Sequence, residues 1–433
     1  MLSPEQAAQV ARITEDNLLR LRHPQYGWSS ALGRHEALHG RDLGIGGLVL
    51  LNSLSPELIP EWFIESTEVG IDVLTQFQGT RFDPEREEEE GVLPHEYRNG
   101  YTPRFRMEQL RATGWPVEEK PDGSLEMRYY GARDVNALII KLIASLARVK
   151  EGRSEGEGRI VIEKYWPSIL AMYRHDTGIA DSSGYGLIDS IPKNLKTLFN
   201  LTEKDNDLAY ITEDREVPRP PHIFLSLNCH FVDSLSEFAW MAQVRGEFSL
   251  AEDAMRRHYE GKRKIHQLFW MKDKGFYSPV IDGEGNQVKI MTDDVVHGLW
   301  CKTFAKPFAD QVIERLQKSD FHTKRWGTRS KSSDSRQFVV NGPSSYWNGV
   351  WPHHVGIAAF GAENYGHTDF AEELDRELAQ IIIEKGCVET GSVDYDGTWY
   401  DYTEGGKPAA CIPQFWAAAV AWSRANRCLL SAA

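Results

Sequence analysis

Six short segments of the chain combine carboxylates with arginine, histidine, aromatic rings and glycine, the residue types that acid–base chemistry on a polar ligand requires. They are residues 40–44, 91–98, 129–134, 185–193, 346–354 and 391–401, the last followed by 411–416. Carboxylates can transfer protons and arginine can hold hydroxyl groups, while flat aromatic faces stack on the C–H surfaces of sugars. Several of these segments come just before an expected helix. In a ring of helices such positions meet on one rim, so together they indicate a carbohydrate pocket.

The elements that must position these segments are mostly helices. Apolar residues recur at i, i+3 and i+4, most clearly in 135–146, 224–238 and 255–269. Strand signals are few, such as Lys274–Val280 before a glycine-rich turn. We expect about twelve helices, or about 36 residues for each helix with its loop, a spacing that suits a ring of helical hairpins.

The chain is expected to form one domain over residues 1–433, because no linker rich in Pro, Gly or Ser divides it. Two long insertions, at about 79–128 and 176–221, interrupt the helices. Loops of this length in a compact domain tend to be functional. The acidic run Glu87–Glu90 inside the first insertion is expected to be a solvated face.

Composition limits the partners of the protein. The 433 residues carry 49 Lys+Arg against 63 Asp+Glu, a net charge of −14, which argues against nucleic acid and anionic membranes as partners. The five cysteines are scattered without a CxxC pair, which is typical of a reducing compartment. Because no signal peptide or membrane-length apolar run is visible, we expect a cytoplasmic location. The sequence leaves the oligomeric state open.

Metal and cofactor chemistry are not expected. His35 and His39 lie four residues apart without an HExxH pattern, and the adjacent pair His353 and His354 is an unusual way to bind one ion. The chain also lacks a GxGxxG turn after a strand, a phosphate-binding GxxxxGK[ST] loop and a GxSxG elbow.

The order and content of these segments resemble the (α/α)6-barrel glycoside hydrolases, above all glycoside hydrolase family 63 and its relatives. Those relatives include α-glucosidases, mannosylglycerate and glucosylglycerate hydrolases, and the amylo-α-1,6-glucosidase domain of glycogen debranching enzymes. The similar segments are GRDLGIGGLVLL (40–51), GVLPHEYRNG (91–100), GLIDSIPKN (186–194), YWNGVWPHH (346–354) and GGKPAACIPQFWAAAVAW (405–422). The resemblance implies an all-α (α/α)6 toroid of about twelve helices, with long loops over the mouth of the active site.

The general acid implied by the resemblance is Asp189, three residues before Pro192 in a segment similar to the GMDNSPRW type. Ile191 and Asn194 depart from that pattern, which has a small polar residue and an aromatic residue there. Three other carboxylates of the same insertion are alternatives: Asp181, Asp205 and Asp207. In the competing interpretation, Asp189 and Ser190 only cap a helix that begins at Pro192.

The general base implied by the resemblance lies a little before the last helix and is usually a glutamate. Asp394 is preferred because its VDYDG context resembles that of the related glucoamylase-type enzymes. An aspartate in place of a glutamate would retract the carboxylate by one methylene. The alternatives are Asp396, Asp401 and Glu404.

Further residues of these segments are expected to hold the sugar. They are Arg41, Asp42, His95, Glu96, Arg98, Tyr130, Asp134, Trp347, Asn348, Trp351, Trp399 and Gln414. A competing interpretation makes Asp42 and Asp134 the N-caps of the helices that follow them. Among the 13 tryptophans, about half are expected to be core residues.

Together these features predict an inverting, exo-acting α-glycosidase for a small α-glucoside or α-mannoside, of the disaccharide or glycosyl-glycerate type. Its two carboxyl groups would lie roughly 6.5–9.5 Å apart to admit a water molecule. Two rivals stay open. One is a sugar epimerase or uronate-processing enzyme that uses histidine on the same toroid, and the other is a catalytically silent carbohydrate-binding toroid.

Overall fold

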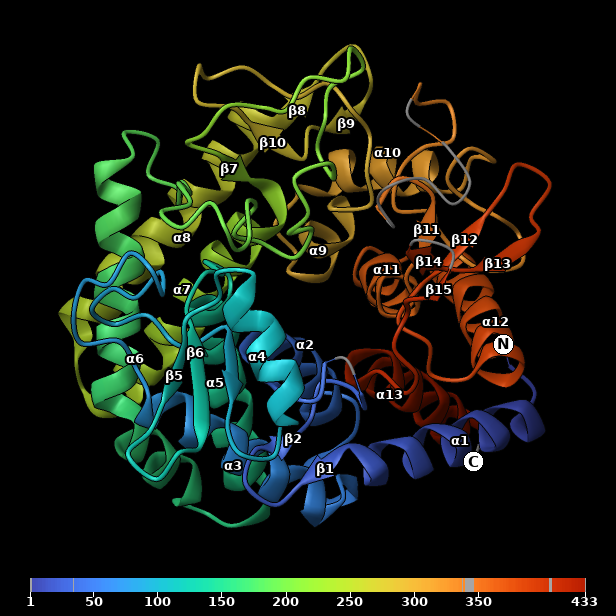
Figure 1. The fold of residues 1–433 in the computed structure, drawn as a ribbon. Coiled ribbons are helices and arrows are strands. Elements are labelled where there is room, and N and C mark those ends of the chain that lie inside the picture. Colours follow the sequence, from blue (N-terminus) through green and yellow to red (C-terminus); the bar gives the residue numbers. More distant parts are fainter. Residues whose placement is uncertain (1, 34, 337, 339–345, 405–406, 433) are drawn as a thin grey trace.

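The computed structural model describes residues 2–33, 35–336, 338, 346–404 and 407–432 (Figure 1). This part of the chain contains thirteen α-helices, one short 3-10 helix (η1, Pro56–Leu58) and several small sheets. The fold is therefore all-α, as the apolar periodicity predicts.

Six helices form a closed inner ring, in which each contacts the next: α2 with α5, then α7, α9, α11, α13 and again α2. Their bounds are α2 (Gly40–Leu51), α5 (Val135–Arg153), α7 (Leu225–Arg245), α9 (Val295–Trp300), α11 (Pro352–Asn364) and α13 (Phe415–Ala432). They are apolar on nearly all sides, as helices enclosed by other helices must be; every residue of α2 is buried. Close packing also needs small residues, because a Cβ on Gly356 of α11 would lie 1.9 Å from Cγ1 of Val420 on α13.

A second layer of helices covers the ring. These are α1 (Pro4–Leu21), α3 (Glu61–Gln76), α6 (Glu157–Ser182), α8 (Phe248–Phe269), α10 (Lys306–Leu316) and α12 (Thr368–Lys385). Each buries one face; α8, for example, buries a narrow stripe that includes Ile265 and Phe269. In Figure 1 the chain ends lie close together because α1 packs on α13. The architecture is an (α/α)6 toroid, as predicted.

The first insertion adds a small subdomain at the mouth of the ring. It contains β4 (Glu96–Arg98), α4 (Arg104–Ala112), β5 (Val117–Glu119) and β6 (Leu125–Tyr129). With β3 (Leu38–His39) the strands form an antiparallel sheet in the order β3-β4-β6-β5. A separate small core that includes Met107, Met127 and Tyr129 holds α4 on this sheet.

The second insertion has no helix and no strand between the end of α6 at Ser182 and β7 (Ile223–Phe224), all of it within the described part of the chain. The expected helix at Pro192 is therefore absent, and the prediction that Asp189 and Ser190 cap it is wrong. Ser190 instead pairs with His222 in an isolated antiparallel bridge.

The other strands are two or three residues long and pair locally. They are β1 (Arg22–His23), β2 (Gly27–Trp28), β8 (Trp270–Met271), β9 (Phe276–Tyr277), β10 (Val280–Ile281), β11 (Gly349–Val350), β12 (Gly391–Val393), β13 (Trp399–Asp401), β14 (Thr403–Glu404) and β15 (Lys407–Pro408). The strand signal at 274–280 corresponds to β9 and the start of β10.

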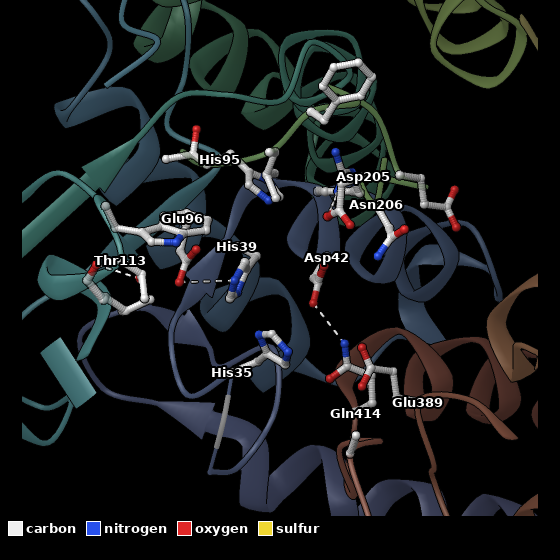
Figure 2. A pocket seen from close by; sticks show the side chains of 18 of the residues that line it. His35, His39, Asp42, His95, Glu96, Thr113, Asp205, Asn206, Glu389 and Gln414 are labelled. Atoms are coloured by element: carbon white, nitrogen blue, oxygen red, sulfur yellow. Dashed lines mark hydrogen bonds and ion pairs between the residues drawn. The ribbon is translucent and has the colours of Figure 1, made fainter. Parts of the chain in front are cut away.

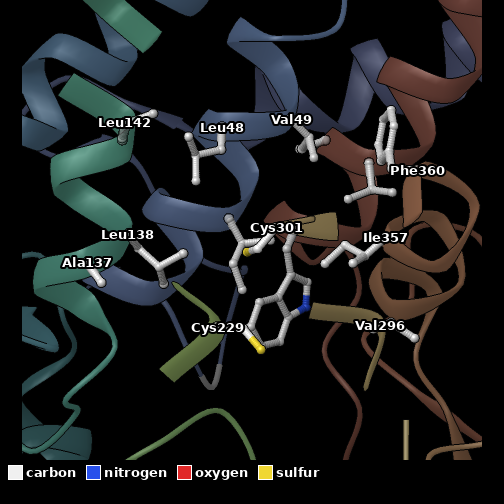
Figure 3. Close-up of a cluster of buried hydrophobic side chains, with 14 of the residues drawn as sticks. Leu48, Val49, Ala137, Leu138, Leu142, Cys229, Val296, Cys301, Ile357 and Phe360 are labelled. Atoms are coloured by element: carbon white, nitrogen blue, oxygen red, sulfur yellow. The ribbon is translucent and has the colours of Figure 1, made fainter. Parts of the chain in front are cut away.

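The main core fills the space between the inner helices (Figure 3). There Leu48 of α2, Leu138 of α5, Cys229 of α7 and Ile357 of α11 lie around a common centre. All five cysteines are free thiols. No helix in the described residues is long and apolar enough to span a membrane.

Candidate active site

A cavity of about 990 Å³ opens at the N-terminal ends of the inner helices (Figure 2). Its walls come from the starts of α2 and α13, from the residue before α11, and from both insertions. The segments that precede these helices therefore do meet on one rim.

The cavity contains part of the predicted site. Seven of the expected sugar-binding residues line it: Arg41, Asp42, His95, Glu96, Arg98, Trp351 and Gln414. Two of the alternatives for the general acid, Asp205 and Asp207, line it as well. The residues that do not line it are Asp189, Asp394, Asp181, Asp396, Asp401, Tyr130, Asp134, Trp347, Asn348 and Trp399.

The two preferred catalytic carboxylates thus lie elsewhere. Asp189 is in the second insertion, where burial raises its pKa and the charge of Arg133 opposes that rise. Asp394 is part of the turn between β12 and β13, where its carboxylate accepts hydrogen bonds from the backbone of Thr398 and the hydroxyl of Tyr400.

Three of the remaining candidates for the general acid and the general base lie outside the cavity. Asp181 is 59% exposed and forms an ion pair with Arg257 at 2.6 Å. Asp396 and Asp401 are exposed, in the β12–β13 turn and in β13. Glu404 ends β14, but its side chain lies outside the described residues.

Neither Asp42 nor Asp134 makes a capping hydrogen bond, so that prediction is wrong. Asp42 is the third residue of α2 and accepts a hydrogen bond from the side-chain amide of Gln414 at 3.1 Å. Asp134 stands at the N-cap position of α5 but accepts from Nε of Arg41 at 2.8 Å instead. Asp134 therefore does not line the cavity itself but holds Arg41, which does.

One wall of the cavity is set by the pairing of β3 with β4, which places His39 opposite Glu96. Nε2 of His39 lies 3.5 Å from the Glu96 carboxylate, and Nε of Arg98 donates to the same oxygen. Burial alone would raise the pKa of Glu96, but its contacts with Arg98 and His39 hold it well below its ordinary value. Glu96 is therefore a fixed negative charge beside the cavity.

Asp205 has a different environment. Its side chain is 32% exposed, and its carboxylate lies 3.6 Å from Nη1 of Arg41. Separation from bulk water raises the pKa of Asp205 to about 6; Arg41 lowers it and the nearby Asp134 carboxylate raises it further. Asp205 can therefore carry a proton near neutral pH.

Glu389 also lines the cavity and was not among the predicted residues. Its carboxylate accepts a hydrogen bond at 3.0 Å from the backbone N–H of Cys411, whose carbonyl accepts from the N–H of Glu389 at 2.9 Å. In the view of Figure 2, Asp42 lies between Asp205 and Glu389. A signal for Glu389 did exist, because Glu389 and Glu404 are the only glutamates between α12 and α13.

Glu203 lies two residues before Asp205, at the floor of the cavity and 5% exposed. Its carboxylate accepts hydrogen bonds from Nε2 of His297 at 2.6 Å, of His353 at 2.8 Å and of His354. Burial would raise the pKa of Glu203, but these contacts hold it well below its ordinary value. In the sequence His353 and His354 stand out only as an adjacent pair, and no local signal links them to the distant Glu203 and His297.

Aromatic rings form much of the remaining surface. Tyr346 stacks on Trp351 with ring centroids 4.9 Å apart, and Trp416 stacks on His353 at 4.1 Å. By contrast, Trp347 donates its indole N–H to the carbonyl of Leu208 and lies outside the lining.

The other predicted residues outside the cavity have structural contacts. Trp399 packs against Trp326, and the Tyr130 hydroxyl donates to the carbonyl of Phe77 at 2.8 Å. Asn348 accepts a hydrogen bond from the Ser392 hydroxyl at 3.3 Å.

Several further lining residues were not predicted: His35, His39, Arg106, Trp115, Glu203, Tyr346, Glu389 and Trp416. Tyr346 and Trp416 lie inside segments that the sequence analysis singled out. Arg106 and Trp115 come from the first insertion, where no motif marks them.

Comparison with known proteins gives one family match. The mannosylglycerate hydrolase MGH1-like glycoside hydrolase domain matches residues 79–399. No curated protein matches the sequence.

Solved structures of similar fold include the GH63 mannosylglycerate hydrolase from Thermus thermophilus in complex with Tris and D-glycerate. It is 15% identical, with a TM-score of 0.68, over 96% of this chain and 99% of that one. An uncharacterized conserved protein from the same organism is 16% identical, with a TM-score of 0.65 over the same shares of the two chains. A rhamnosidase from Klebsiella oxytoca with rhamnose bound is 13% identical, with a TM-score of 0.58, over 98% of this chain and 64% of that one.

Proposed function

The chain belongs to the mannosylglycerate hydrolase MGH1-like glycoside hydrolase family, and from this premise we propose that it hydrolyses a small α-glucoside or α-mannoside with inversion of configuration. Asp205 would be the general acid and Glu389 the general base. The observation that carries the proposal is that both line the cavity, whereas Asp189 and Asp394 do not.

Asp205 is suited to the acid role because of its environment. A general acid works best when its pKa lies near the working pH, and the pKa of Asp205 is raised to about 6. In the described residues its carboxylate has one ion-pair partner, Arg41, at 3.6 Å, so its oxygens are open to the cavity.

Glu389 is suited to the base role because of its place and its support. It precedes the last inner helix, α13, where the resemblance implies a glutamate. The backbone N–H of Cys411 orients the Glu389 carboxylate, which would accept the proton of an attacking water.

The proposed reaction is a single displacement at the anomeric carbon. Asp205 donates its proton to the glycosidic oxygen as the bond to the anomeric carbon breaks. Glu389 removes a proton from a water molecule whose oxygen attacks that carbon from the opposite face. The products are a free sugar of inverted configuration and the released alcohol. The two carboxyl groups then exchange protons with solvent to restore the starting state.

The rest of the cavity would hold the substrate. Asp42, Arg41 and Gln414 supply hydrogen bonds for sugar hydroxyls, and Trp351 and Trp416 supply aromatic surface. Residues of both insertions close the cavity, which favours exo action on one or two sugar units. The solved relative from Thermus thermophilus is a mannosylglycerate hydrolase, so a glycosyl-glycerate is among the substrates we propose.

The histidine-based rival has less support. The deeply buried imidazoles of His297, His353 and His354 do not line the cavity and cannot touch a substrate there. The imidazoles that do line it include His95, whose pKa burial holds well below its ordinary value.

The test is hydrolysis of a panel of α-linked disaccharides, mannosylglycerate and glucosylglycerate, followed by NMR. We expect the β anomer to appear first. The variants Asp205→Asn and Glu389→Gln should lose about 10²–10⁴-fold in kcat, whereas the matched controls Asp189→Asn and Asp394→Asn should stay within about threefold. Release of the α anomer, or full activity of Asp205→Asn, would refute the proposal, and binding without hydrolysis would favour the silent toroid.

A further inference from the structure

We propose that Glu203 is a positioning residue, which holds Asp205 at the place where it donates its proton. This inference rests on the proposed function, because it takes Asp205 as the general acid. It assigns a role to the buried histidine cluster, which the proposed chemistry does not use.

Asp205 lies in a segment without regular secondary structure. No helix or strand occurs between Ser182 and Ile223. The backbone near Asp205 is held by Asn200 and Tyr346. The Tyr346 hydroxyl donates to the carbonyl of Glu203 at 2.9 Å, the Asn200 side-chain amide donates to the carbonyls of Lys204 at 3.2 Å and Asn206 at 2.7 Å, and the Asn200 backbone N–H donates to the carbonyl of Asp205 at 3.4 Å. A catalytic carboxylate needs a defined position, so side chains must supply the missing rigidity.

Glu203 supplies the first anchor. Its carboxylate receives hydrogen bonds from three imidazoles on two inner helices, His297 on α9 and His353 with His354 on α11. These side chains are between 0% and 5% exposed. The segment is therefore fixed to the wall of the ring at one point, two residues before Asp205.

Lys204 supplies a second anchor on the same wall. Its ammonium contacts the carboxylates of Asp293 and of Asp294, the latter at 2.8 Å, and the carbonyl of Ser330 at 3.3 Å. Asp293 also accepts from Nδ1 of His354 at 2.6 Å, so the two anchors join in one network. Of the three consecutive charged side chains, those of Glu203 and Lys204 are held in this network and are at most 5% exposed, whereas that of Asp205 is 32% exposed and lines the cavity.

The distances within the network are those of hydrogen bonds. His354 lies between two carboxylates and donates from both nitrogens, so it is an imidazolium. His297 donates from Nε2 to Glu203 and accepts at Nδ1 from Nε2 of His230 at 3.0 Å. The separations of 2.6 and 2.8 Å to Glu203 are those of hydrogen bonds. Two ligands of one tetrahedral zinc ion would lie about 3.3 Å apart.

Removal of the Glu203 charge would break this anchor and leave the His354 cation with one carboxylate. The segment would then shift, and Asp205 with it. A displacement of about 1 Å at a catalytic group can cost about 10²-fold in rate. The loss should be specific to proton donation, because Arg41, Asp42 and Glu389 are held by other contacts.

The experiment compares two substrates that differ in their need for an acid. The methyl α-glycoside needs a proton on its leaving oxygen, whereas the α-glycosyl fluoride of the same sugar leaves as fluoride without one. Asp205→Asn should lose about 10²-fold or more on the methyl glycoside and only a few-fold on the fluoride. Glu203→Gln should show the same selective loss, with at least about tenfold on the methyl glycoside.

A matched control is Glu377→Gln, which alters another buried glutamate that receives a hydrogen bond from a histidine, His322, at 2.7 Å, outside the cavity. It should change both activities by the same small factor. Circular dichroism and thermal melting check folding. If Glu203→Gln does not fold, Glu203→Asp keeps the charge, shortens the side chain by one methylene, and should show the selective loss to a smaller extent.

The outcomes distinguish the assignment of Asp205 as general acid from the positioning role of Glu203. If Asp205→Asn loses equally on both substrates, the assignment of the general acid fails. If Asp205→Asn is selective but the Glu203 variants lose equally on both substrates, the positioning role of Glu203 is refuted. If the wild-type enzyme loses activity on dialysis against EDTA and regains it with zinc, these residues bind a metal ion, and the hydrogen-bonded anchor is refuted.

Discussion

The carboxylate of Asp134 provides a direct way to change the pKa of the proposed acid. Asp134 and Asp205 share one guanidinium, with contacts of 2.8 Å and 3.6 Å to Arg41, so their negative charges lie close together. Asp134 raises the pKa of Asp205, and Arg41 lowers it. The variant Asp134→Asn removes the repulsion, keeps the shape of the side chain and retains an oxygen that can accept from Arg41.

The size of the effect follows from Coulomb's law. Because one guanidinium touches both groups, the carboxylates are at most about 9 Å apart. At about 8 Å their repulsion is about 2 kcal/mol with an effective dielectric constant near 20, and about 0.5 kcal/mol in water. The pKa of Asp205 should therefore fall by about one unit, from about 6 toward about 5.

The assay is the pH profile of kcat/KM from pH 4 to 9 on the methyl α-glycoside. The acid must be protonated, so the wild-type rate should fall above about pH 6, by about tenfold for each further unit. Asp134→Asn should move this alkaline limb about one unit toward lower pH. On the α-glycosyl fluoride the limb should be weak in both proteins. A limb that stays in place or moves to higher pH would refute the electrostatic link between Asp134 and Asp205.

Three further predictions concern the base, the packing of the ring and the histidine cluster. Glu389→Gln should lose about 10²–10⁴-fold in kcat on the methyl glycoside and the fluoride alike, since both need an activated water; a loss confined to the methyl glycoside would contradict the base role. Gly356→Ala should lower the free energy of unfolding by about 1–3 kcal/mol in a denaturant titration, because the new methyl meets Val420 at 1.9 Å. Its control Gly178→Ala, in open space on α6, should be neutral or stabilising, and equal losses for the two would contradict the packing argument. His354 has a pKa raised to about 10, against about 6.5 unfolded, because Asp293 and Glu203 outweigh its burial. Its stabilising contribution is complete below about pH 6.5 and is lost as the pH rises toward 10, so His354→Gln should flatten the decline of unfolding free energy over that window, and an unchanged slope would argue against an imidazolium.

The ring of helices could be predicted because its signals are local. The i, i+3, i+4 spacing in 135–146 and 224–238 marks α5 and α7, and each helix keeps that pattern whatever its neighbours do. The place of the site was predictable for a related reason: segments just before inner helices must meet on one rim. Arg41, Asp42 and Gln414 were found in this way.

Local sequence motifs could not identify which carboxylates line the cavity. Asp189 stands in the segment that resembles the general-acid motif of the family, yet Asp205 lines the cavity, in a stretch with no motif and no regular secondary structure. What distinguishes Asp205 is its contact with Arg41 on α2 and the anchoring of its neighbours on α9 and α11. These are contacts between residues far apart in the sequence, and short motifs cannot encode them.

The same reasoning explains why the sequence did not reveal the partners of the histidines. Sequence spacing invites a test of His353 and His354 as a pair of metal ligands, and adjacency argues against that role. In the structure both imidazoles turn to a third residue, Glu203, which the chain brings from the second insertion. A carboxylate that accepts from three imidazoles has little capacity left to act on a substrate. We therefore infer that Glu203 acts by holding the backbone of its segment in place, and with it Asp205, two residues further along the chain.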